Sequence, residues 1–182
     1  MILKKQIPNL LTLSRIIAIP LILAAFYFQT QAWHIVAASI FTIASITDFF
    51  DGYLARTWKI QSKLGRFLDP IADKLLVGSS IIVLVRFGFA DVIPAVAIIC
   101  REILVSGLRE FLADLKISVP VTSLAKIKTG VQMTAIGLLL LGNKGFGIEY
   151  TELLGAFLLW VAAALTLITG YAYLRAGLKH MD

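Results

Sequence analysis

The chain has 182 residues, of which 59% are hydrophobic and 15% are charged, and its formal net charge is +6. Soluble domains are nearer half apolar and about one quarter charged, so this composition excludes an ordinary soluble domain and favours an integral membrane protein. The single cysteine excludes an internal disulfide.

Six apolar runs follow one another along the chain. Each is close to the roughly 20 residues that cross a bilayer as a helix. They cover residues 9–29, 33–54, 70–88, 92–112, 124–142 and 153–175. Because their connections are short, we predict an all-α integral membrane protein with a single domain over residues 1–182. This domain is a bundle of six transmembrane helices with a short amphipathic segment at residues 1–8.

The basic residues predict how this bundle lies in the membrane. Of the 17 lysines and arginines, thirteen lie before the first run, after the sixth run, or around the second and fourth connections. The odd-numbered connections hold two basic residues. By the positive-inside rule, both termini and the acidic stretch described below face the cytoplasm, in a multi-pass protein of the inner (cytoplasmic) membrane. The net positive charge therefore needs no nucleic-acid partner.

The first run carries polar residues along one side, namely Asn9, Thr12 and Arg15. An arginine inside a span costs about 2.5–3.5 kcal/mol on insertion scales, so Arg15 needs a partner. Two interpretations stay open: Arg15 reaches the cytoplasmic headgroups, or the three residues form a wall of a diphosphate site. For His34, at the start of the second run, we expect a position at the level of the headgroups.

The second run ends in an acidic stretch. Asp48, Asp51, Gly52 and Ala55 fall on one face if this segment is helical, and Arg56 adds a donor for phosphate. The two small residues leave bare backbone beside the carboxylates. A flat base or a pyrophosphate therefore has room to approach.

A second acidic pair opens the third run. Asp69 and Asp73 are four residues apart and also share a helical face. By itself, Asp69 before Pro70 is typical of a helix cap, and the proline disfavours a helix that starts much earlier. Together with the first pair, the two aspartates would form a four-carboxylate cluster, which needs cations to offset its repulsion. Because Mg²⁺ takes carboxylate and phosphate oxygens, the stretch predicts a metal–diphosphate site at a membrane boundary.

The fourth and fifth runs carry basic residues that are candidates for binding a second anionic group. Arg109 lies at the cytoplasmic end of the fourth run and is a candidate phosphate ligand. Lys126 and Lys128 do not share a helix face, so we expect one of them to point inward, although membrane topology alone also accounts for both. For Arg101 and Glu102 we expect structural pairs across helices, because neighbouring residues do not face each other along one helix.

The array D-x2-D-G-x2-A-R-x8-G-x3-D-x3-D, from Asp48 to Asp73, resembles the signature of the CDP-alcohol phosphotransferase family at every fixed position. The layout of six spans resembles that family over the whole chain. Three flanking segments look like the phosphatidylglycerophosphate synthases within it. These segments are N-L-L-T-L-S-R in the first run, R-E in the fourth and K-I-K-T at the start of the fifth.

The resemblance implies an enzyme that transfers a phosphatidyl group from CDP-diacylglycerol to an alcohol, here glycerol 3-phosphate, and releases CMP. It also implies two divalent cations, Mg²⁺ or Mn²⁺, a membrane phospholipid environment, a homodimer, and Asp73 as the general base. The implied metal ligands are Asp48, Asp51, Asp69 and Asp73. The implied CDP-diacylglycerol site is Gly52, Ala55, Arg56 and Gly65 with Asn9, Thr12 and Arg15. The implied acceptor phosphate site is Arg109 with Lys126 or Lys128.

Three alternatives stay open at this point. The chain resembles family members with other acceptors in the same acidic array, so serine or an inositol phosphate could replace glycerol 3-phosphate. A membrane prenyltransferase also uses aspartates and Mg²⁺ on a diphosphate, but with other spacings and more helices. A small membrane transporter would place its charged residues near midspan, whereas the aspartates cluster at one membrane edge.

Overall fold

The computed structural model describes residues 2–58, 63–115, 117 and 123–178, and it describes side chains over residues 12–47, 68–113, 115, 117 and 123–177. Six helices account for nearly all of this. They are α1 (Ile2–Tyr27), α2 (Gln31–Trp58), α3 (Lys63–Arg86), α4 (Val92–Asp114), α5 (Ser123–Phe146) and α6 (Thr151–Leu178). The prediction of an all-α chain is therefore confirmed for the described residues, which contain no strand. The predicted N-terminal segment is not separate from the first helix, because α1 runs unbroken from Ile2.

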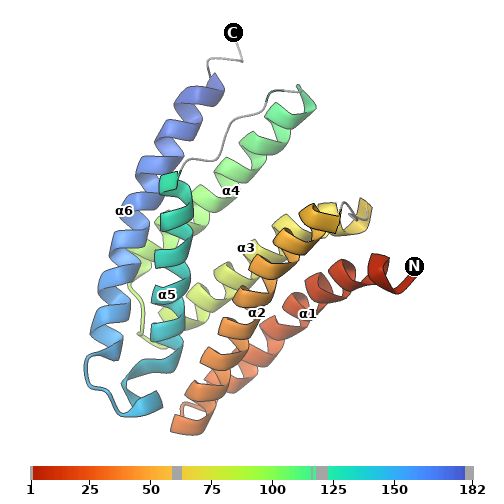
Figure 1. The fold of residues 1–182 in the computed structure, drawn as a ribbon. Coiled ribbons are helices and arrows are strands. Elements are labelled where there is room, and N and C mark those ends of the chain that lie inside the picture. The colour runs from red at the N-terminus through yellow and green to blue at the C-terminus, as the bar shows by residue number, and fades with distance from the viewer. Residues whose placement is uncertain (1, 59–62, 116, 118–122, 179–182) are drawn as a thin grey trace.

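The helices form two groups of three that meet along α2 and α5 (Figure 1). In one group α1 packs on α2 and α3, and in the other α6 packs on α4 and α5. The two groups are also joined, less extensively, where α3 contacts α4 and α5. The N-terminal ends of α1, α3 and α5 lie at the same end of the bundle as the C-terminal ends of α2, α4 and α6 (Figure 1). We call this end, which contains Asp69, the aspartate end, and the opposite one the far end.

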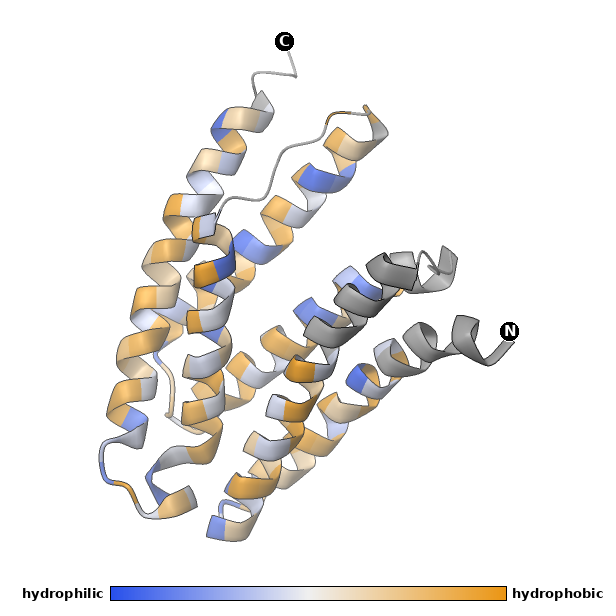
Figure 2. Ribbon diagram, in the orientation of Figure 1, coloured by the Kyte–Doolittle hydropathy of each residue, from blue (hydrophilic) through white to orange (hydrophobic). Residues whose placement is uncertain are grey.

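Among the described residues, two helices are long and apolar enough to cross a membrane by length and composition, α5 over Ser123–Phe146 and α6 over Thr151–Gly177. Their most apolar windows are only 33% and 39% buried, whereas a core helix of a soluble protein would be mostly buried. Large apolar side chains such as Leu153 and Phe157 of α6 instead lie exposed along the helix, and Figure 2 shows hydrophobic residues over most of its length. A surface of this kind is stable in lipid and not in water. These features favour a membrane protein, and the six-span count stays a prediction.

A continuous apolar core holds the two groups together. It includes Ile22 and Phe26 of α1, Phe41 of α2 and Ile136 of α5, all almost fully buried. At the far end, His34 also lies inside the bundle, where its Nδ1 is 2.9 Å from the Leu140 carbonyl oxygen. The expectation that His34 lies at the level of the headgroups concerns its depth in the membrane and stays a prediction. Its ring is enclosed by protein.

The start of α3 differs from the expectation. The helix begins at Lys63, and Pro70 lies inside it. The expectation that proline disfavours so early a start is wrong here, because a proline in a packed membrane helix loses one backbone hydrogen bond without ending the helix. Lys74 lies one turn after Pro70, and its Nζ donates a 2.8 Å hydrogen bond to the Pro70 carbonyl oxygen. Asp69 is consequently a mid-helix residue and not a cap, and its carboxylate is free to face other helices.

Candidate active site

Asp69 and Asp73 lie one turn apart on α3, and both contact Arg15 of α1, while Asp69 also contacts Thr12. Thr12 donates a hydrogen bond from Oγ1 to Asp69 Oδ1. Arg15 donates from Nη1 to Asp73 Oδ1 at 2.5 Å, and its Nη2 lies 3.7 Å from Asp69 Oδ1. The two carboxylates are still 38% and 37% exposed. They are held from behind by α1 and are open on their other side.

The partner that Arg15 requires is thus supplied by α3. The Arg15 side chain is 1% exposed, so its guanidinium does not reach outward to headgroups. A buried guanidinium is tolerated when carboxylates offset its charge and accept its hydrogen bonds. Of the two interpretations of Arg15, the geometry supports a wall of the acidic site. The third residue of that predicted wall, Asn9, has a side chain outside the described ones.

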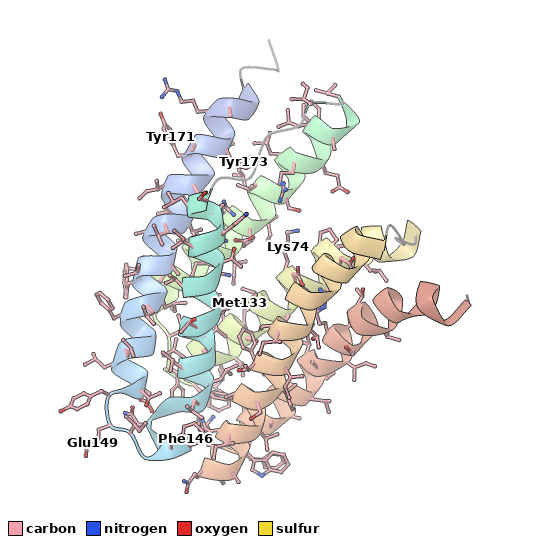
Figure 3. All side chains as sticks on the ribbon, viewed as in Figure 1. Lys74, Met133, Phe146, Glu149, Tyr171 and Tyr173 are labelled. Atoms are coloured by element: carbon pink, nitrogen blue, oxygen red, sulfur yellow. The ribbon has the colours of Figure 1, made fainter. Side chains whose placement is uncertain are left out.

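A cavity of about 680 Å³ opens in front of the two aspartates, between α3, α4 and α5. Asp69, Asp73 and Lys74 line it from α3, and Figure 3 labels Lys74 and, on α5, Met133 beside this space. Opposite them, α4 contributes Arg101, Glu102, Arg109 and Glu110, and α5 contributes Lys128 and Gln132. Acidic and basic side chains therefore share one space at the aspartate end of the bundle. An anionic ligand and cations could bind there together.

A cluster of charged side chains forms the wall on the α4 and α5 side. Glu102 accepts a hydrogen bond from Lys128 Nζ, and its Oε1 lies 3.3 Å from Arg101 Nη1. Arg101 Nη2 in turn donates to Thr169 Oγ1 on α6 at 3.1 Å. The predicted pairing across helices is found for Glu102 with Lys128. The expectation that Arg101 and Glu102 do not meet along one helix is wrong, because both long side chains bend toward the cavity.

The structure separates the predicted acceptor residues. Lys128 is 4% exposed and lines the cavity, whereas Lys126 is exposed and does not line it. This agrees with the expectation that one of the two lysines points inward. Arg109 lines the cavity as well, and its guanidinium carbon lies 5.8 Å from the centre of the Tyr173 ring. The described geometry therefore places Arg109 and Lys128, but not Lys126, in the same space as Asp73.

Helix α6 supports this wall in a way that its apolar sequence did not suggest. A Cβ atom added to Gly170 would lie 2.9 Å from Arg101 Cγ, so the glycine leaves room for the arginine stem. Thr169 binds the guanidinium of the same arginine, and Tyr173 stands beside Arg109. The available signal was a threonine–glycine pair within an apolar helix, which often marks a close contact between helices.

Several predicted site residues have side chains outside the described ones. They are Asn9, Asp48, Asp51, Gly52, Ala55, Arg56 and Gly65. The α2 backbone is helical through Trp58, so the predicted common face of Asp48, Asp51, Gly52 and Ala55 is consistent with its helical course. Among the described side chains, no group of three or more histidines, cysteines, aspartates or glutamates lies together. Asp69 and Asp73 do offer the hard oxygen atoms that Mg²⁺ and Mn²⁺ take, on the open side of the cavity.

Comparison with known proteins agrees with this arrangement. The family model described as CDP-alcohol phosphatidyltransferase matches residues 5–168. A protein of Rickettsia felis is 52% identical over 176 residues, which cover 97% of each chain. Proteins of Salmonella typhimurium and Cereibacter sphaeroides are 42% and 37% identical, with 94% and 97% of each chain covered. All three carry the name CDP-diacylglycerol–glycerol-3-phosphate 3-phosphatidyltransferase.

Proposed function

The chain belongs to the CDP-alcohol phosphatidyltransferase family, and from this premise we propose that it transfers the phosphatidyl group of CDP-diacylglycerol to glycerol 3-phosphate. The products are phosphatidylglycerophosphate and CMP. The observation that carries the proposal is that Asp69, Asp73, Arg109 and Lys128 all line the same cavity. Relatives that are similar over nearly their whole length bear the name of this activity.

The acidic wall is the proposed site of the diphosphate and of two divalent cations, Mg²⁺ or Mn²⁺. Their ligands would be Asp69 and Asp73 with Asp48 and Asp51. When bound, two such ions neutralise charge on a diphosphate and on the leaving CMP. Arg15 holds the Asp73 carboxylate in one orientation through its 2.5 Å hydrogen bond. Asp73 is the proposed general base for the hydroxyl of the acceptor, because it borders the space that the acceptor would enter.

The nucleotide end of CDP-diacylglycerol is proposed to lie over the small residues at the end of α2, Gly52 and Ala55, with Arg56 on a phosphate. Gly65, Asn9, Thr12 and Arg15 complete this proposed site. Of these, Thr12 and Arg15 already contact the aspartates. They would therefore act mainly by fixing the carboxylates and by adding one positive charge behind them.

The lipid part of the donor has a candidate position next to this cavity. An apolar groove of about 610 Å³ runs between α2 and α5, from Ile46 and Met133 toward Phe146. Met133 lines both spaces, so the groove adjoins the polar cavity. An acyl chain in the groove would remain in apolar surroundings while its diphosphate lies at the aspartates. This arrangement suits a substrate that is part lipid and part nucleotide.

The acceptor's own phosphate is proposed to bind Arg109 and Lys128. Both line the cavity at a distance from α1, on the wall opposite Asp73. Lys128 is already paired with Glu102, so the phosphate would share this lysine with a carboxylate. Serine, which carries no phosphate, would make little use of such a wall. An inositol phosphate would use it, and it is the second candidate acceptor within the same family.

The remaining parts of the proposal concern location and assembly. We propose a multi-pass protein of the inner membrane, with both termini and the aspartate end on the cytoplasmic side, because the basic residues gather there. A homodimer is proposed from the resemblance to the family. A transporter, the alternative from another class, is disfavoured because Asp69 and Asp73 are the seventh and eleventh residues of α3 and so lie in its N-terminal half, toward the aspartate end.

The test uses purified protein in detergent with radiolabelled CDP-diacylglycerol, Mg²⁺ or Mn²⁺, and a panel of acceptors. Glycerol 3-phosphate should be converted in a cation-dependent manner, and serine should not. Preference for serine or an inositol phosphate would overturn the acceptor assignment. Absence of transfer to every acceptor, with the label bound and moved across proteoliposomes, would favour the transporter.

A further inference from the structure

One polar side chain of the cavity has no role in the function proposed above. Gln132, on α5, lines the cavity, yet the residue is only 2% exposed. Its Oε1 has no hydrogen-bond partner among the described residues. Buried amide oxygens in native proteins are almost always paired, because an unpaired one costs free energy. The side chain lines the cavity, so a rotation of its buried amide would bring the unpaired oxygen to a group that arrives with the ligand.

The position of Gln132 relates it to the acceptor and not to the nucleotide. It follows Lys128 by four residues, so the two lie on the same face of α5, one turn apart. Both line the cavity that Asp73 lines from α3 and Arg109 from α4. A small molecule whose phosphate lies at Lys128 and Arg109 and whose hydroxyl reaches Asp73 would therefore lie alongside Gln132.

The chemistry of the amide oxygen restricts its partner. An amide oxygen accepts hydrogen bonds and cannot donate them, and the oxygens of a phosphate dianion are acceptors too. Gln132 Oε1 thus needs a donor such as a hydroxyl. Glycerol 3-phosphate carries two hydroxyls: the primary one would attack the donor lipid, and the secondary one takes no part in the transfer.

We propose that Gln132 determines acceptor specificity by accepting a hydrogen bond from the non-reacting secondary hydroxyl of the acceptor. This inference rests on the proposed function, since it assumes a phosphorylated polyol in the cavity. Gln132 would recognise an unreactive part of the substrate and would not take part in proton transfer. It would place the primary hydroxyl relative to Asp73, and it would disfavour acceptors that leave its oxygen unpaired.

The experiment compares two acceptors that differ in that hydroxyl alone, glycerol 3-phosphate and propane-1,3-diol monophosphate. The second keeps the phosphate and the primary hydroxyl. The parent should favour glycerol 3-phosphate in kcat/KM by roughly ten- to a hundredfold. Gln132→Leu should bring this ratio to within about threefold, mainly by lowering kcat/KM for glycerol 3-phosphate. Gln132→Glu, which keeps an accepting oxygen, should retain a preference for glycerol 3-phosphate.

Thr166→Val is the matched control. Thr166 Oγ1 is also buried and has no hydrogen-bond partner in the described part of the chain, but Thr166 does not line the cavity, so the loss of its hydroxyl should leave the ratio unchanged. If Gln132→Leu does not accumulate in membranes, Gln132→Asn carries the same comparison, because it withdraws the amide by one methylene. A parent that transfers to both acceptors equally, or a ratio that Gln132→Leu leaves unchanged, overturns the inference. A parent that does not transfer to glycerol 3-phosphate at all refutes the proposed function instead.

Discussion

Replacing Arg15 tests whether the acidic wall depends on the support that it receives from α1. Arg15→Gln removes the guanidinium that donates to Asp73 at 2.5 Å and lies 3.7 Å from Asp69. The longer contact is electrostatic, whereas the shorter one is a hydrogen bond between charged groups, of the kind that contributes about 1.5–3 kcal/mol. If the carboxylate needs this bond to keep its orientation, kcat should fall by roughly ten- to a hundredfold. The kcat of Arg15→Lys should lie between that of the parent and that of Arg15→Gln, because lysine keeps the positive charge but lacks the planar guanidinium.

The assay is a two-substrate kinetic matrix in detergent, together with a thermal unfolding curve for each variant. Arg86→Gln is the control, since Arg86 is an exposed arginine at the last residue of α3, toward the far end. It should leave kcat unchanged. A kcat for Arg15→Gln equal to that of Arg86→Gln, measured below both unfolding transitions, would refute a positioning role for Arg15. A large loss of stability in Arg15→Lys as well would show that the buried guanidinium serves mainly to hold α1 on α3.

Three further perturbations address the other walls and the far end. Changing any one of the four aspartates of the array to asparagine should nearly abolish transfer, while the protein remains folded in detergent. Near-normal turnover in two of these variants would contradict a site built from all four aspartates. Arg109→Ala should raise the KM of glycerol 3-phosphate by roughly ten- to a hundredfold and leave the KM of CDP-diacylglycerol nearly unchanged. The control, Lys126→Ala, should change neither KM. Equal effects of the two substitutions would indicate that these residues set membrane topology and do not bind phosphate. Gly142→Ala should destabilise the protein by about 1–2 kcal/mol without changing either KM. The reason is that Gly142 has a φ of +62° and that the Cβ of an alanine there would lie 3.2 Å from Glu152 Oε1. An unchanged unfolding temperature would contradict this expectation of strain.

Much of the secondary structure follows from local features of the sequence. Apolar runs of about 20 residues specify helices wherever they occur in a membrane protein. All six predicted runs correspond to helices whose bounds lie within seven residues at the start and four at the end. The starts of α1 and α3 each differ by seven residues, and in α3 Pro70, which was expected near the start, lies in the eighth position instead. A propensity penalty was outweighed there by the packing of α3 on α1.

Which side chains share a face of one helix could also be predicted from the sequence. The spacing of Asp69 and Asp73 places both on one face of any helix that contains them, whatever surrounds it. The alternation of Lys126 and Lys128 likewise indicates that one of them turns inward. His34 shows the limit of such reasoning, because its place at the start of the second run did not indicate that Phe26 and Phe89 would pack against its ring.

The sequence by itself determined that this chain is an all-helical membrane protein in which Asp69 and Asp73 share one helical face. Only the tertiary structure decided that Arg15 serves Asp73, that Lys128 is the inward lysine, and that Gln132 lines the same cavity with a buried oxygen that has no partner among the described residues. Spacing along a chain sets which residues share a face of one helix. It does not set how far each helix is rotated about its axis against its neighbours, and that rotation, fixed by the packing of all six helices together, decides which faces meet.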